Sequence, residues 1–146
     1  MRERFSFDYA VVRVVPRVER GEFLNVGVIL FAPTAAYLKA KIELDRTRLS
    51  ALAPLTDCTA VESYLELIPR ICEGGGEAGS IGELPQRARF HWLVAPRSTV
   101  IQMSPVHSGV DYDLDAALDR LFAKLVGMDG RDDGGPPAGR QGRLRS

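Results

Sequence analysis

Apolar residues in the first third of the chain recur with the period of extended strands. Residues 7–18 are rich in valine and aromatic side chains on both faces, residues 23–33 are almost continuously apolar, and residues 37–44 alternate apolar with charged side chains. These patterns predict two strands buried on both faces and a third strand with one face in water. Pro16 should end the first strand, because proline removes a ladder donor. The short connection at 19–22 makes the first two strands an antiparallel hairpin.

The middle of the chain carries helical periodicity. Residues 59–73 place apolar side chains three and four positions apart, and Thr59 with Glu62 has the spacing of a capping box. Pro69 lies inside this segment and is expected to bend or interrupt the helix. The glycine-rich residues 74–82 predict a mobile loop after it.

A second hairpin and a final helix complete the prediction. Residues 90–95 and 99–103 are apolar enough for two strands joined across Pro96, Arg97 and Ser98. Asp113 then has the side chain of a helix N-cap. The helix that follows is defined by one apolar stripe, made of Leu114, Leu118, Leu121, Phe122 and Leu125.

These elements predict an α+β fold for one globular domain over residues 1–127. We expect an antiparallel sheet of four to five strands, built from the N-terminal meander and the later hairpin, with the two helices packed on one face. Residues 128–146 are rich in Gly, Pro, Arg and Asp and nearly devoid of apolar side chains, which predicts a disordered tail. The length of 146 residues suits a single domain, and 45% hydrophobic and 26% charged residues are ordinary for a globular protein.

Charge and hydropathy narrow the classes of partner. Lys and Arg together number 19, as do Asp and Glu, so no net charge attracts nucleic acid or an anionic membrane, and nucleic-acid binding is not expected. No segment has the roughly 18 to 20 apolar residues of a membrane span, and no signal peptide is visible. The two cysteines lie in no paired motif, which suits a reducing compartment. Together these features predict a cytoplasmic protein.

The start of the second strand holds the least ordinary residues, because Glu22, Asn25 and Gly27 stand among core-forming side chains. They offer a carboxylate, an amide and a close approach for a backbone or ligand, but they would equally satisfy a turn and mark a β-bulge. Arg13 lies mid-strand among valines and needs a partner, which we expect to be Glu22. Two alternatives follow. Arg13, Glu22 and Asn25 form a cluster open to a ligand, or Arg13 and Glu22 form a buried pair that fixes the hairpin.

The turn at Arg97 and Ser98 offers a guanidinium fork and a hydroxyl that would hold a phosphate or carboxylate, although turns also select such residues for solubility. The soft metal ligands of the chain are Cys58, Cys72, His91 and His107. None of them falls in a CxxC or HxxxH spacing, so we expect no metal site and no cofactor.

The segment RVVPRVERGEFLNVGVIL, with APRSTVIQ and LDRLFAKLVG later in the chain, resembles the uncharacterised bacterial family called domain of unknown function 3037 (DUF3037). The resemblance spans about residues 7–127, and its most specific part is the proline-terminated strand followed by GE, two residues and NVGV. The family pattern falls on Arg13, Pro16, Gly21, Glu22, Asn25, Gly27, Arg97 and Ser98. The resemblance implies a compact bacterial cytoplasmic domain without an established activity, encoded in many members beside a HipA-like kinase.

We therefore expect a non-catalytic accessory or interaction protein, with a HipA-like kinase as its partner. Its binding residues would be Arg13, Glu22, Asn25, Arg97 and Ser98. The alternative is a small hydrolase or nuclease in which Glu22 acts as an acid, base or metal-binding carboxylate and Arg13 or Arg97 stabilises negative charge.

Overall fold

The first strand, β1 (Phe5–Val14), is the centre of the sheet and is paired along both of its edges. The computed structural model describes residues 2–96 and 99–127 of the chain. From β1 the chain continues through β2 (Leu24–Ala32) and β3 (Tyr37–Ile42) as an antiparallel meander, which confirms the predicted N-terminal half of the sheet.

The other edge of β1 is covered by two short strands in succession, β4 (Ile101–Met103) and β5 (His107–Asp111). Both run antiparallel to β1. Between them Ser104 keeps the chain attached, because its N–H donates to the carbonyl of Val11 at 2.9 Å and its hydroxyl accepts from the N–H of Val11 at 2.8 Å. β4 and β5 therefore act as one edge strand with an interruption.

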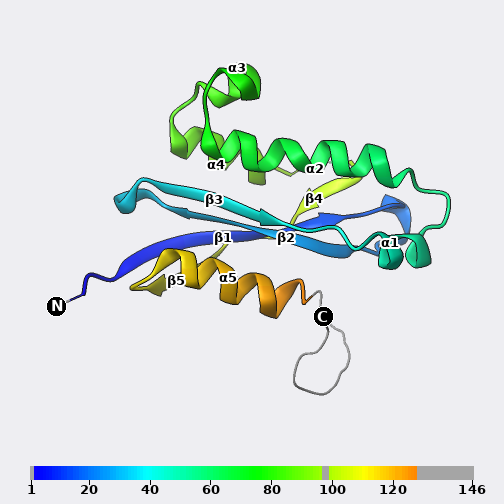
Figure 1. Ribbon diagram of the computed structural model, residues 1–146, viewed down its shortest axis with the longest axis horizontal. Helices are drawn as coiled ribbons and strands as arrows, with labels where there is room; N and C mark the ends of the chain where they lie inside the picture. The colour runs from blue at the N-terminus through cyan, green and yellow to red at the C-terminus, as the bar shows by residue number, and fades with distance from the viewer. Residues whose placement is uncertain (1, 97–98, 128–146) are drawn as a thin grey trace.

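Helices lie on both faces of this sheet (Figure 1). The α-helices are α1 (Arg46–Leu52), α2 (Cys58–Glu73), α3 (Gly79–Gly82), α4 (Gln86–Val94) and α5 (Leu114–Leu125). The single-turn 3-10 helices are η1 (Val18–Arg20), η2 (Pro33–Ala35) and η3 (Gly76–Ala78). The predicted α+β class with a five-stranded antiparallel sheet is confirmed, and two helices, α2 and α4, pack on one face. The C-terminal helix α5 differs from the prediction, because it covers the opposite face.

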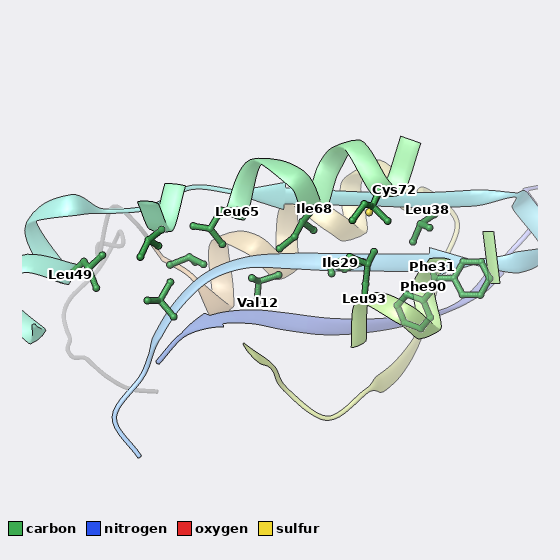
Figure 2. Close-up of a cluster of buried hydrophobic side chains, with 14 residues drawn as sticks. Val12, Ile29, Phe31, Leu38, Leu49, Leu65, Ile68, Cys72, Phe90 and Leu93 are labelled. Carbon is green, nitrogen blue, oxygen red and sulfur yellow. The ribbon is translucent and has the colours of Figure 1, made fainter. Parts of the chain in front are cut away.

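The larger core lies between the sheet and the helices α2 and α4 (Figure 2). Val12 of β1, Ile29 and Phe31 of β2 and Leu65 of α2 belong to this cluster. Phe90 of α4 stacks on Phe31 with ring centroids 5.0 Å apart. The smaller core lies under α5. It is made of Phe7, Val28, Leu30, Ala32, Leu114, Ala117, Leu118, Leu121, Phe122 and Val126.

This division follows from the alternation of side chains along a strand. Val28 and Leu30 point to one face of the sheet, whereas Ile29 and Phe31 point to the other, and all four are almost completely buried. A strand that is apolar on both faces requires a cover on both faces. The uninterrupted apolar run of β2 therefore accounts for α5 lying opposite α2.

The predicted strand over residues 90–95 is wrong, since this segment belongs to helix α4. Arg89, Phe90 and Leu93 are its buried residues, a spacing that matches one helical face. The predicted hairpin across residues 96–98 is therefore not formed. The second strand of that hairpin, predicted over residues 99–103, is present but shorter, as β4, and it pairs with β1.

Two smaller expectations also change, and one lies outside what the structure describes. The carboxylate of Asp57, not Thr59, caps α2 by accepting from the N–H of Ala60 at 3.1 Å. The glycine-rich segment 74–82, expected to be a loop, contains η3 and α3. The predicted disordered tail, residues 128–146, lies outside the described residues. Among the helices that are described, none combines the length and apolar character needed to cross a membrane.

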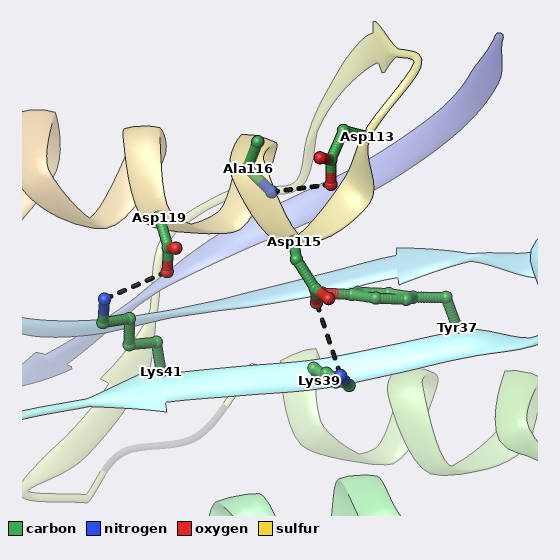
Figure 3. A network of polar contacts seen from close by, with 7 residues as sticks. All are labelled: Tyr37, Lys39, Lys41, Asp113, Asp115, Ala116 and Asp119. Carbon is green, nitrogen blue, oxygen red and sulfur yellow. Dashed lines mark hydrogen bonds and ion pairs between the residues drawn. The ribbon is translucent and has the colours of Figure 1, made fainter. Parts of the chain in front are cut away.

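Polar side chains attach the first two turns of α5 to β3 (Figure 3). The carboxylate of Asp115 accepts from the hydroxyl of Tyr37 at 2.6 Å and from Lys39 Nζ at 3.3 Å, and Lys41 Nζ donates to Asp119 at 3.0 Å. Asp113 caps the helix as predicted, by accepting from the N–H of Ala116. These contacts fix the orientation of the helix on the sheet.

Candidate functional site

Arg13 lies near the end of β1, between two polar neighbours on adjacent strands. In the sheet register Arg13 lies opposite Asn25 of β2 on one side and opposite Gln102 of β4 on the other. The guanidinium carbon lies 4.2 Å from the centroid of the Phe23 ring, which is 47% exposed. The Nε atom is buried and has no hydrogen-bond partner, and burial lowers the pKa of the side chain. Arg13 is thus a half-buried cation without an acceptor among the described residues.

Asn25 links this position to the end of α5. Its Nδ2 donates to the carbonyl of Leu125 at 3.0 Å, so Asn25 and its register partner Arg13 lie on the α5 side of the sheet. The Oδ1 atom of Asn25 is buried and has no donor. The strand pair therefore holds an unsatisfied acceptor and an unsatisfied donor on neighbouring residues.

The pairing of β1 with β2 is irregular at this point, as the sequence suggested. Arg13 pairs with Asn25 and Val12 pairs with Gly27, so Val26 is an extra residue in β2. Gly27 is needed for close packing, because a Cβ there would come within 2.6 Å of Ile42 Cδ1 and 2.7 Å of the carbonyl oxygen of Lys41. The close approach at Gly27 is therefore that of the β3 backbone.

Glu22 is not the partner of Arg13. Its two carboxylate oxygens accept from Nε and Nη2 of Arg20, each at 3.0 Å. The hydrogen bond from Arg20 lowers the pKa of Glu22, and the charges of Arg20 and Arg17 contribute to the same shift. The expected pair between Arg13 and Glu22 is thus wrong, because an arginine two residues away along the chain takes the carboxylate.

Glu22 lines an open hollow of about 550 Å³ at the end of the β1–β2 hairpin. One wall is the connection between these strands, with Pro16, Arg17, Arg20 and Glu22. The other wall is residues 51–56, the end of α1 and the link to α2, which carries no ionisable side chain. The structure thus separates the predicted residues into Arg13 with Asn25 on the α5 side of the sheet, and Glu22 in this hollow beside α1.

The remaining predicted binding residues, Arg97 and Ser98, lie outside the described part of the chain. Within that part no three His, Cys, Asp or Glu side chains gather in a way that could hold a metal ion. Cys72 is a core residue, and burial raises the pKa of its thiol to about 12, which keeps it protonated. The ring of His107 packs against Tyr9 at a centroid distance of 5.5 Å.

Sequence reasoning missed Phe23, Arg17 and Arg20. The apolar pattern predicts Phe23 as the first residue of a buried strand, but β2 begins at Leu24 and the ring is exposed beside Arg13. The ERGE turn, residues 19–22, did carry a signal for Arg20, because Arg20 and Glu22 are only two residues apart in a short connection.

A family model described as "Protein of unknown function (DUF3037)" matches residues 9–126, which is most of the chain. The chain belongs to the DUF3037 family. The DUF3037 match includes β1 from Tyr9 onwards, the hollow, and α5 in full, so both groups of polar residues lie in the family's domain. Neither the curated proteins nor the solved structures gave a match to this chain.

Proposed function

We propose that this chain is a non-catalytic accessory protein that binds a protein partner on the sheet surface formed by Arg13, Phe23 and Asn25. We propose further that it acts in the cytoplasm and that the partner is a HipA-like kinase, as the family resemblance implies. Arg97 and Ser98 are proposed as further binding residues.

A contrast between two arginines carries the proposal. Among the described arginines, all but Arg13 and Arg89 are exposed. Arg89 donates three hydrogen bonds of 3.0 to 3.1 Å to the carbonyls of Ile71, Cys72 and Leu84. Arg13 makes none. The buried Nε of Arg13 is an unsatisfied donor, which is destabilising, whereas the two terminal nitrogens are not buried. A partner can therefore supply acceptors to these terminal nitrogens.

The composition of the surface also suits a protein partner. Arginine and aromatic residues are enriched among the residues that dominate binding energy at protein interfaces. Here Arg13 stacks on an exposed phenylalanine. The pair therefore presents a cation and an apolar ring together, next to the amide of Asn25.

The arrangement of Glu22 does not favour the hydrolase or nuclease alternative. Its carboxylate is engaged by Arg20, which lowers its pKa and makes it a poorer proton donor at neutral pH. Arg13, the residue expected to stabilise negative charge beside it, lies on the α5 side of the sheet instead. The accessory function is therefore the better supported of the two.

The test is sedimentation of the purified protein mixed with the HipA-like kinase encoded in the same genome. Wild type should form a complex, and Arg13→Ala should weaken it by about 30-fold or more, as removal of a central interface residue does. Phe23→Ala should also weaken it. Arg70→Ala is the matched control, because Arg70 is exposed on α2.

Two results would overturn the proposal. The absence of a complex with wild type at micromolar concentrations would exclude the kinase as partner. A complex that Arg13→Ala and Arg70→Ala leave equally intact would exclude the surface.

A further inference from the structure

The hollow beside α1 has features that the proposed partner surface does not use. Its volume of about 550 Å³ lies within the roughly 300 to 1,000 Å³ of small-molecule sites. It is bounded by two connections that are far apart in sequence, residues 16–22 and 51–56. Cations line only the first wall, so the hollow has a charged side and an uncharged side.

The charged side of the hollow holds two arginines, Arg17 and Arg20, and one carboxylate, Glu22. Arg20 holds the Glu22 carboxylate by two hydrogen bonds of 3.0 Å, and the charge of Arg17 lowers the pKa of the same carboxylate. The side chain of Arg17 has no hydrogen bond or ion pair of its own among the described residues. Arg20 therefore pairs with Glu22, whereas Arg17 lines the same wall without a side-chain partner among the described residues.

The Glu22 carboxylate is weakly held. The side chains of Arg20 and Glu22 are 55% and 44% exposed, and exposed ion pairs of this kind contribute little to stability because solvent screens them. A ligand that carries more than one negative charge and more than two acceptor oxygens would satisfy both arginines better than Glu22 does.

We propose that the hollow is a binding site for a phosphate monoester, with Glu22 occupying the place of the phosphate when the ligand is absent. The phosphoryl oxygens accept from Arg20 and Arg17, and Glu22 is displaced. The organic group of the ligand lies against the uncharged wall at residues 51–56, where Leu55 is 93% exposed.

The role of Glu22 as an internal competitor gives the proposal its sharpest test. Binding of phenyl phosphate to the full chain should be measured by isothermal titration calorimetry. Arg17→Ala and Arg20→Ala should each weaken binding about 10-fold, as loss of a charge-assisted hydrogen bond does. Glu22→Gln should instead tighten binding several-fold, because the competing negative charge is removed while the size of the side chain is kept.

The matched control is Arg48→Ala, which removes an exposed arginine of α1 that does not line the hollow. Inorganic phosphate and benzoate are the comparison ligands. Phenyl phosphate should bind more tightly than inorganic phosphate if the uncharged wall contributes, and more tightly than benzoate if the second charge does.

Three results would overturn the proposal. Equal binding by Arg17→Ala and Arg48→Ala would show a non-specific charge effect. Weaker binding by Glu22→Gln would show that Glu22 does not compete with the ligand. Benzoate binding as tight as that of phenyl phosphate would assign the hollow to carboxylates. None of these results bears on the Arg13 surface, which lies on the α5 side of the sheet.

Discussion

Arg89 is the one charged side chain that is buried among the described residues, at 8% exposure. It lies on α4 and donates to the last carbonyls of α2, at Ile71 and Cys72, and to the carbonyl of Leu84 before α4. The last carbonyls of a helix lack hydrogen-bond partners within the helix and carry partial negative charge. A guanidinium stabilises them both by hydrogen bonding and by its favourable interaction with the helix dipole. One residue thereby joins α2 to α4.

We expect Arg89→Met to lower the free energy of unfolding by about 3 kcal/mol, because it keeps much of the side-chain volume but leaves buried carbonyls without donors. Urea denaturation followed by far-UV circular dichroism measures this change. Arg70→Met is the control, since Arg70 is exposed in the last turn of α2, and it should change stability by less than about 0.5 kcal/mol. Equal effects of the two substitutions would contradict the role assigned to Arg89.

At the residue scale the sequence identified unusual positions better than it identified their partners. Arg13, Asn25 and Gly27 do lie where the pairing of β1 and β2 is irregular. A cation, an amide and a glycine are unusual in apolar strands, so the sequence alone marks these positions. The sequence predicts the wrong partner for Glu22, because a mid-strand Arg13 requires a carboxylate whereas Arg20 reaches that carboxylate within the turn.

At the scale of elements, the meander and the two longest helices were predictable because their apolar residues are periodic over many positions. α4 was not, since a short apolar run such as FHWLVA fits a strand as well as a helix. β5 was missed because its strand signal is weak. Gly109 in its centre carries no side chain, and a Cβ there would come within 2.6 Å of the Phe7 ring.

The attachment of α5 to β3 should depend on pH. Hydrogen bonds from Tyr37 and Lys39 lower the pKa of Asp115 in the fold, so the ionised carboxylate is favoured by folding. Its contribution is therefore complete above the unfolded pKa of about 3.9 and is lost as the pH falls through the lower folded pKa.

We expect Asp115→Asn to reduce stability at neutral pH by up to about 1 kcal/mol, the scale of an exposed pair, and by less at about pH 2. The measurement is the urea midpoint of wild type and variant across the acid range. Glu66→Gln, which removes an exposed carboxylate outside this network, is the control. A difference between Asp115→Asn and wild type that stays constant as the pH falls would contradict the assignment.

At the scale of the whole molecule, the two cores are not independent, because β1 and β2 contribute side chains to both. A loss of packing under α5 should therefore destabilise the α2 side as well. Trp92, the single tryptophan, lies on α4 on that side of the sheet and can report it.

Leu118→Ala, which removes a buried side chain under α5, should lower the free energy of unfolding by about 2 to 4 kcal/mol. The transition followed by Trp92 fluorescence should move by the same amount as that followed by circular dichroism. A Trp92 transition that stays in place would show that the two faces of the sheet unfold separately.

The interrupted edge formed by β4 and β5 has a consequence for how the protein behaves at high concentration. A long, regular edge strand offers a template on which another chain can add, which leads to aggregation. Here the edge changes register at Ser104, where a side-chain hydroxyl replaces a backbone acceptor, and Pro105 offers no N–H. β4 and β5 are each short and pair with β1 in different registers, so this edge of the sheet is a poor template for the addition of another strand.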